Sequence, residues 1–315
     1  MGATGDRAAG GRAAKPYSLR SLRADAVWTA LPARDQRLLL WLLAGDVVTA
    51  QLASLLVYGA LRVAQRRLAR LVEYGLLRGF WTASAQRPRG RHAYALTRAA
   101  RSDLERLQWP EGPPDRPPAL PASPPIHQLA THDLLAAFLR AGRPETGEGL
   151  VSWAPERPCG DLLGVVRPDA LAGIRVGERT LALLLERDLG TERGEVLADK
   201  VRRYRWAFTQ APADGLAVGF AVESARRAQT IHALGRRQPG GLTVLTVAAE
   251  RLLADPLGAP WYDGEQPRSI RDLAAAAAPG DGPILAPGCL LDPDALAAFD
   301  DQGAATLSAL APYLR

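Results

Sequence analysis

Three acidic residues interrupt a pair of apolar segments between residues 167 and 190. The stretch RPDALAGIRVGERTLALLLERDLG predicts two strands around a two-residue Gly-Glu turn, because glycine suits the first central position of a type II′ turn. In the register set by this turn, Asp169 lies directly opposite Glu186. Side chains alternate along a strand, so Asp188 falls on the same face, opposite Arg167. The spacing therefore predicts a cluster of carboxylates inside an otherwise apolar strand pair.

Two facing carboxylates, with Cβ atoms roughly 5 Å apart, repel each other unless a cation lies between them or one takes up a proton. Mg²⁺ is bound by one or two carboxylates together with water and substrate phosphate, and it can activate a water for attack on phosphorus. We therefore expect Asp169 and Glu186 to be ligands of Mg²⁺ or Mn²⁺. The alternative is a set of surface ion pairs on an exposed strand end, with Arg167 and Asp188 as the couple.

A single lysine supports the first interpretation. The chain has 39 basic residues, and all except Lys15 and Lys200 are arginines. Lys200 falls about two turns into a helix predicted after Thr191, from which its side chain can return toward Glu186. A compact ammonium at this place could stabilise charge during phosphate chemistry. Chance retention of one lysine is the competing explanation.

The elements that must position these residues follow the pattern of a mixed sheet with helices on its faces. An amphipathic helix at 127–142 precedes them and carries Asp133, which we consider as a further metal ligand or as a solvated residue. His127 and His132 on the same helix are five apart and do not share a helical face, so we expect them to be structural or exposed. Strand patterns then occur at 150–155, 165–176, 180–188, 216–222 and 242–247, and helix patterns at 192–208, 224–234 and 249–254. Hairpin strands followed by strand–helix alternation indicate an α/β domain.

The N-terminal third has a different pattern. It predicts a first helix at about 32–43, a second, short helix that starts at the N-cap Thr49, and a third helix at 60–74. Two strands follow, at 76–83 and 92–97. Helices followed by a basic hairpin are the order of a winged helix-turn-helix, whose last helix enters the major groove. The candidate DNA contacts are Arg62, Gln65, Arg66 and Arg70 on one face of the third helix, and Arg87, Arg89 and Arg91 at the tip of the hairpin. A solvated basic face without a ligand is the alternative.

The distribution of charge agrees with this division. Residues 1–110 contain 18 basic and 7 acidic residues, whereas the remainder contains 21 and 26, so the halves differ in sign. We expect a disordered basic tail at 1–30, a winged helix at 31–109, a Pro-rich linker at 110–125, the α/β domain at 126–262 and a helical extension at 263–315. Double-stranded DNA is the partner expected of the basic part.

Several classes of protein are disfavoured. No run reaches the roughly 18 apolar residues that a membrane helix needs, and the N-terminus lacks the apolar core of a secretory signal. Cys159 and Cys289 are the only cysteines, and neither has a partner at a spacing that would bind a metal. Two isolated cysteines are typical of a protein whose thiols stay reduced. We expect a cytoplasmic protein with no membrane partner.

The motifs together resemble the replication-relaxation family of bacterial plasmids and integrative elements. The resemblance runs from about Pro32 to Trp261 and includes the predicted winged helix and the motifs RPDAL, LLERDLGTER and DKVRRY. It implies a DNA-binding protein of replication or mobilisation whose second domain is similar to the PD-(D/E)XK, or restriction-endonuclease-like, fold. Asp169 then matches the aspartate of that motif and Glu186 its second acid.

One position departs from the motif, since Asp188 stands where it has lysine. Either Lys200 supplies the amine from the neighbouring helix, which makes Asp169, Glu186, Asp188 and Lys200 the candidate catalytic set of an endonuclease, or the domain only binds. A transcriptional regulator whose second domain dimerises or senses a ligand remains the alternative function. Replication or transfer proteins and a second copy of the chain are further candidate partners.

Overall fold

The computed structural model describes residues 24–82, 90–108, 125–164, 166–209, 215–236, 242–275, 277, 279, 280, 284, 285 and 287. Most of the predicted tail and linker lies outside these residues, as do Arg87 and Arg89 of the predicted hairpin tip. The end of the predicted tail forms a short helix, α1, at Ala24–Ala30. None of the described helices is both long enough and apolar enough to cross a membrane.

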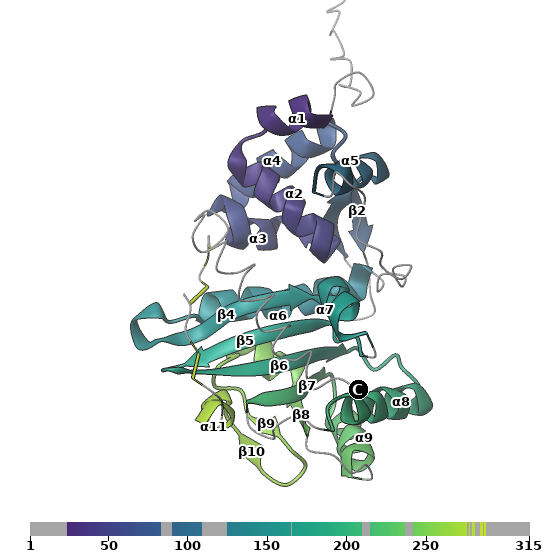
Figure 1. Cartoon of the computed structure of the whole chain (residues 1–315), viewed down its shortest axis with the longest axis vertical. Helices are drawn as coiled ribbons and strands as arrows, with labels where there is room; N and C mark the ends of the chain where they lie inside the picture. Colours follow the sequence, from purple (N-terminus) through teal and green to yellow (C-terminus); the bar gives the residue numbers. More distant parts are fainter. Residues whose placement is uncertain are drawn as a thin grey trace, which may run out of the picture.

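The N-terminal part consists of helices and a small sheet (Figure 1). Its elements after α1 are α2 (Ala33–Gly45), β1 (Val47–Thr49), α3 (Ala50–Ala53) with a π-helical turn at Ser54–Tyr58, α4 (Leu61–Glu73), β2 (Leu77–Thr82), β3 (Arg91–Leu96) and α5 (Arg98–Gln108). The three strands pair antiparallel in the order β1-β3-β2. The predicted order of helices followed by a hairpin is confirmed, and β1 and α5 add to it. Thr49 is the expected N-cap, because its Oγ1 accepts a hydrogen bond from the Leu52 N–H at 3.2 Å.

Helix α4 packs through one face and exposes the other. Ala64, Leu68 and Leu71 are fully buried, as the helical period requires. Leu61 and Val72, which the same helical period also predicts to face the core, are exposed. Two polar side chains complete the buried face, since Arg67 of α4 forms an ion pair with the fully buried Asp35 of α2. The Tyr58 hydroxyl donates a second hydrogen bond to Asp35 at 2.9 Å.

The second part contains a seven-stranded mixed sheet in the order β10-β9-β8-β7-β6-β5-β4. Its strands are β4 (Glu148–Pro155), β5 (Ala170–Val176), β6 (Arg179–Asp188), β7 (Leu216–Val222), β8 (Thr243–Ala248), β9 (Trp261–Tyr262) and β10 (Pro267–Arg268). Only the pairs β6–β7 and β7–β8 are parallel, because helices connect these strands. The predicted α/β class is confirmed. The segment after residue 263, which we expected to be helical, begins with β10 before α11 (Ile270–Ala275).

Helices cover both faces of this sheet (Figure 1). On one face, a hydrophobic cluster joins Leu183 and Leu185 of β6 to α6 (Pro125–Ala141), α10 (Ala249–Ala254) and α11, and extends into the N-terminal helices. On the other face, Leu184 of β6 packs with α7 (Glu156–Leu163), α8 (Gly194–Ala207) and α9 (Ala225–Arg236). Because neighbouring residues of β6 point to opposite faces, Glu186 lies on the face of α7 and α8.

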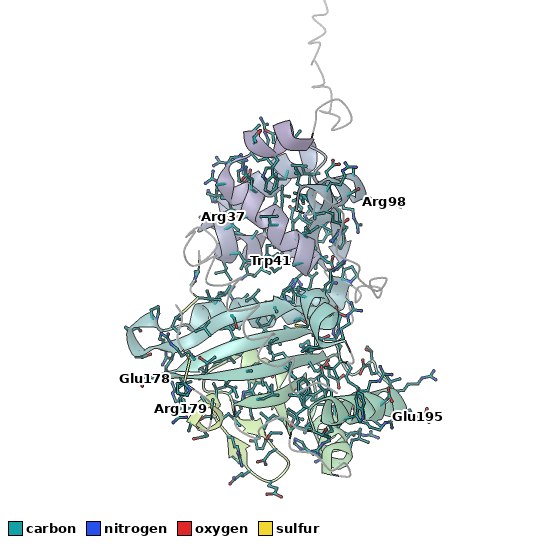
Figure 2. All side chains as sticks on the ribbon, in the orientation of Figure 1. Arg37, Trp41, Arg98, Glu178, Arg179 and Glu195 are labelled. Atoms are coloured by element: carbon teal, nitrogen blue, oxygen red, sulfur yellow. The ribbon has the colours of Figure 1, made fainter. Side chains whose placement is uncertain are left out.

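Helix α6 lies between the N-terminal part and the sheet. Trp41 of α2, labelled in Figure 2, has its ring centroid 5.0 Å from that of His132 on α6. Most of α6 is buried, and the core cluster continues through it from α2 and α4 to β4 and β6. The two parts are therefore packed against each other through a shared apolar core.

A second contact between the two parts is polar and centres on Asp46, which follows α2 in a left-handed backbone conformation with φ 58°. Its carboxylate pairs with Arg101 of α5 at 2.5 Å and with Arg157 of α7 at 2.8 Å. Gln128 of α6 donates to it at 3.3 Å. We call this group the Asp46 clamp. It connects α2 and α5 of the N-terminal part to α6 and α7, which cover opposite faces of the sheet.

Candidate functional site

The predicted strand register is confirmed by the pairing of β5 and β6, which runs from Val176–Arg179 to Ala170–Leu185 without a shift. Asp169 precedes the first paired residue of β5 and is held at the expected position, because its Oδ2 accepts a hydrogen bond from the Arg187 N–H at 2.6 Å. Asp169 and Glu186 are only 8% and 1% exposed. Both line a cavity of about 350 Å³, which we call the acidic cavity.

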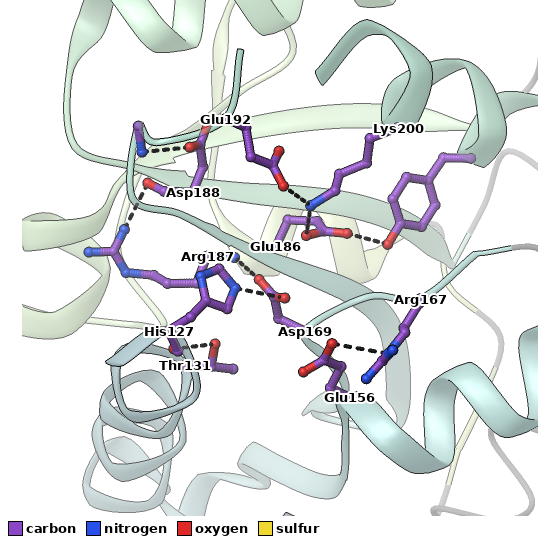
Figure 3. Close-up of polar contacts among 12 residues, drawn as sticks. His127, Thr131, Glu156, Arg167, Asp169, Glu186, Arg187, Asp188, Glu192 and Lys200 are labelled. Atoms are coloured by element: carbon purple, nitrogen blue, oxygen red, sulfur yellow. Dashed lines mark hydrogen bonds and ion pairs between the residues drawn. The ribbon is translucent and has the colours of Figure 1, made fainter. Parts of the chain in front are cut away.

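Glu186 is held by two side chains from α8 (Figure 3). Nζ of Lys200 lies 3.0 Å from Oε2 of Glu186, and the hydroxyl of Tyr204 donates to Oε1. The helical period explains the arrangement, because residues 200 and 204 are one turn apart on the face of α8 that meets the sheet. Lys200 also pairs with Glu192 at 3.1 Å. The predicted return of Lys200 toward Glu186 is confirmed, whereas the contact of the Tyr204 hydroxyl was not predicted.

Asp169 has a partner that the sequence analysis missed. Nε2 of His127, in the first turn of α6, lies 2.9 Å from Oδ1 of Asp169 (Figure 3). The spacing of His127 and His132 showed only that these two residues do not act as a pair. The sequence did offer one signal: the proline-rich segment ends at Pro125, where α6 begins, so His127 must lie in the first turn of this helix. Its contact with β5 is tertiary, and no local pattern encodes it.

The environment of the cavity shifts the acids in opposite directions. Burial raises the pKa of Glu186 to about 8; the ammonium of Lys200 opposes this shift and the charge of Asp169 adds to it. For Asp169, burial favours the neutral form, but the hydrogen bond and charge of His127 outweigh it and lower the pKa. A proton taken up by the pair of acids therefore resides on Glu186.

The two bases of the cavity keep their protons more tightly than usual. Burial lowers the pKa of Lys200, but the charges of Glu186, Asp169 and Glu192 reverse this and raise it above its ordinary range. Burial likewise opposes protonation of His127, whereas the hydrogen bond and charge of Asp169 raise its pKa. Lys200 is thus a fixed cation and not a proton acceptor at neutral pH.

The ion pair between Arg167 and Asp188, which the alternative interpretation predicted, is wrong. Nε of Arg167 pairs instead with Glu156 of α7 at 3.0 Å, since the β5–β6 ladder ends at Ala170 and Arg167 lies outside it. Asp188 pairs with Arg227 of α9 and accepts a hydrogen bond from the Gly190 N–H at 2.7 Å. It lines the acidic cavity, as alternation predicted, and also fixes the turn between β6 and α8.

Asp133, the candidate additional ligand, lies away from the acidic cavity. Its carboxylate pairs with Arg91 of β3 at 2.6 Å. The two residues face a different cavity, of about 240 Å³, which Arg140 and Gln51 also line. Arg91 therefore connects the hairpin to α6 and is less available to DNA than expected.

The remaining described candidates for DNA contact lie together on α4. Arg62, Gln65, Arg66 and Arg70 are all exposed. Arg70 contacts Glu73 at 3.3 Å and the hydroxyl of Tyr74 at 3.2 Å, both on its own helix. The exposed face of α4 is thus predominantly cationic.

Asp169 and Glu186 place two carboxylates in the acidic cavity, the type of ligand that a hard divalent cation takes. Among the described residues there is no cluster of three or more His, Cys, Asp and Glu side chains that could hold a metal ion. The cavity instead offers carboxylates of two residues, and each of their four oxygens already meets a protein donor. A carboxylate oxygen accepts more than one contact, so Asp169 and Glu186 could contribute to a Mg²⁺ shell completed by water and phosphate oxygens.

The fold and the site define an α/β protein in which a helical N-terminal part is packed onto a mixed sheet with a charged cavity at the carboxyl end of a central strand. The chain belongs to the replication-relaxation family, whose family model matches residues 41–218, more than half of the chain. This match includes α4, β5, β6 and the α8 residue Lys200. No curated protein and no solved structure matched the chain.

Proposed function

We propose that this protein binds double-stranded DNA through α4 and the β2–β3 hairpin, acting as a winged helix, in the replication or mobilisation of a plasmid or integrative element. The observation that carries the proposal is the exposed row of Arg62, Arg66 and Arg70, one turn apart on α4. Arginine suits this role because its planar guanidinium can bind phosphate or a guanine edge through two hydrogen bonds. Membership of the replication-relaxation family supports the biological setting.

The arrangement of α4 also separates its binding face from its structural face. Arg67 turns inward to Asp35 and fixes the helix to α2, whereas the other three arginines remain in solvent. The opposite face carries the buried Ala64, Leu68 and Leu71. A helix anchored in this way could enter a major groove with its cationic face forward.

Replacing both Arg62 and Arg66 by alanine is expected to weaken duplex binding at least tenfold at about 150 mM salt, because two phosphate or base contacts are lost. The slope of log K against log salt is expected to fall by about 0.9 for each phosphate contact removed. Fluorescence anisotropy with a labelled duplex at several salt concentrations measures both quantities. The matched control is Arg226→Ala, which removes an exposed arginine of α9, on the face of the sheet opposite α6. Equal losses in the control and the double variant would remove α4 from the interface.

The acidic cavity supports a second candidate activity, a divalent-cation-dependent cleavage of a DNA phosphodiester. Asp169 and Glu186 would hold Mg²⁺ or Mn²⁺, which when bound supplies Lewis-acid activation of phosphate and water. Lys200, kept protonated by its acidic neighbours, would stabilise negative charge on phosphate. His127 and Tyr204 would orient the two carboxylates, and Asp188 would hold the turn that leads to α8. The alternative is a domain of the same family that binds without cleaving.

Incubation with supercoiled plasmid and Mn²⁺ is expected to produce nicked circles, and Asp169→Ala and Glu186→Ala are each expected to lower the rate at least a hundredfold. Retardation of the intact plasmid by both variants checks that the N-terminal part still binds. Retardation by the wild type without nicking would instead support a binding module. A bound site at the gene's own promoter, and not at an origin or transfer locus, would favour the transcriptional regulator.

A further inference from the structure

The β2–β3 hairpin presents an exposed tryptophan that neither the core nor the acidic cavity uses. Trp81 is 71% exposed, the highest value among the large exposed hydrophobic side chains of the described residues. It is paired across the hairpin with His92, and the ring centroids of the two residues are 5.2 Å apart. This exposure leaves a large flat ring of Trp81 open to a binding partner.

The indole is supported from beneath by a row of rings that reaches into the core. The ring of Tyr94, 9% exposed, meets His92 edge-on with centroids 4.7 Å apart. Gly79 leaves the space in which the His92 ring lies, since a Cβ at this position would be 2.9 Å from Cε1 of His92. We call Trp81, His92 and Tyr94 the aromatic row. It places a flat hydrophobic ring in solvent without the conformational freedom of an isolated surface side chain.

The charge around the row indicates the chemistry of the partner. From residue 74 to residue 102 the sequence contains six arginines and no aspartate or glutamate, although Arg91 and Arg101 pair with Asp133 and Asp46. One of them, Arg78, is exposed on β2 with its guanidinium 5.1 Å from the ring of Phe80, on the opposite face of the hairpin from Trp81. An anionic partner is favoured by such a surface. Aromatic rings among arginines are the combination that binds single-stranded nucleic acid, because each base has a face on which an indole can stack.

The bases of a continuous duplex cannot stack on such a ring, because both faces of each base are already stacked on neighbouring base pairs. We infer that Trp81 is a stacking platform for an unpaired base of DNA, engaged where the duplex held by α4 is locally open. The inference rests on the proposed DNA binding and adds a preference among DNA structures. The occupant of the platform is thus a nucleobase beside a duplex, and not a second protein.

The test compares three labelled DNA probes of equal length: a full duplex, a duplex with a short unpaired stretch and a single strand. The wild-type full chain is expected to bind the partly unpaired duplex about tenfold more tightly than the full duplex, a ratio within the range for stacking of one base. Trp81→Ala is expected to remove this preference while changing duplex affinity less than twofold. Trp81→Phe, which keeps a flat ring, is expected to retain most of it.

Two further variants make the result specific. Gly79→Ala is expected to reduce the preference because it displaces His92 from beneath the indole. Trp206→Ala removes another exposed tryptophan, on α8, and is expected to leave the preference unchanged. As a direct signal, 2-aminopurine in the unpaired stretch is expected to be quenched by the wild type and not by Trp81→Ala.

Equal binding of all three probes by the wild type, or equal loss on all three in Trp81→Ala, would overturn the inference. A change of sedimentation coefficient in Trp81→Ala, with no change in DNA preference, would also overturn it and would assign the row to contact between copies of the chain. If the wild type binds no duplex, the proposed function itself fails. If duplex binding persists without a preference, only the stacking platform fails.

Discussion

In the absence of divalent cations, the stability of this protein is expected to fall as pH rises from about 5 to about 8. The reason is Glu186, whose pKa is raised by burial from its ordinary value of 4.5 to about 8 in the folded chain. A raised pKa means that the folded state binds the proton more tightly than the unfolded state does. The contribution of Glu186 to the free energy of unfolding is therefore complete below the pKa of the unfolded state, and it is lost as the pH rises through the pKa of the folded state. The loss is on the order of 4 kcal/mol.

The other titratable groups of the acidic cavity refine this expectation. His127 also has a raised pKa, so its contribution is lost above its ordinary value of 6.5, in the same direction as that of Glu186. Asp169 has a lowered pKa and contributes above its ordinary value of 3.8, so its contribution is lost only in acid. Lys200 is protonated throughout this range. Glu192, which pairs with Lys200, also lines the cavity, as do Glu156, Arg167, Arg187 and Asp188.

Glu186→Gln is expected to remove most of the pH dependence, because the amide keeps the shape of the side chain without ionising. Urea unfolding at pH 5, 6.5 and 8 in EDTA measures the effect. Glu178→Gln makes the same chemical change at an exposed turn, labelled in Figure 2, and is expected to follow the wild type. At pH 8, Mn²⁺ is expected to restore stability to the wild type and not to Glu186→Gln. A wild-type curve that is flat with pH would contradict the assigned state of Glu186.

Replacement of Asp35 by alanine is expected to lower the free energy of unfolding by about 3 kcal/mol, since breaking a buried ion pair leaves its partners without compensation. Asp35 is fully buried and bonds to both Arg67 and Tyr58. Arg67 fixes α4 to α2 through Asp35, so the variant is expected to hold α4 less firmly. Its DNA binding is therefore expected to weaken at temperatures where it begins to unfold.

A double-mutant cycle isolates the pair. Arg67→Ala is expected to be at least as harmful as Asp35→Ala, because it leaves a charge with no exposed surface. The combination of Asp35→Ala with Arg67→Ala is expected to be less harmful than the sum of the two single changes. Asp35→Asn retains a partner for Tyr58 and is expected to cost less. Additive effects would show that the two charges do not stabilise each other.

The parts of the site that could be predicted were those encoded locally. The Gly-Glu turn and the period of two along β6 were sufficient to place Asp169 opposite Glu186, and the scarcity of lysine was sufficient to mark Lys200. The family resemblance agreed with these residues and is confirmed by the family match. The roles of the residues in binding and catalysis stay predictions.

The parts that were missed depend on tertiary contacts or on very short elements. His127 meets Asp169 across a sequence separation of 42 residues. The helical period places Arg67 beside the buried Leu71, but its partner Asp35 is 32 residues away in the sequence and no local pattern identifies it. Strands of two residues, such as β9 and β10, have no period to detect, and their pairing with β8 and with each other is decided by the completed sheet.

The Asp46 clamp has a consequence for any DNA that reaches both parts of the molecule. Since α5, α6 and α7 share one carboxylate, the cationic face of α4 and the acidic cavity cannot rotate independently without breaking it. For a DNA duplex bound by α4, the distance along the double helix from the groove that holds α4 to the acidic cavity would then be fixed. Whatever happens to the phosphate backbone at the cavity would therefore occur at one repeated offset from the bound site.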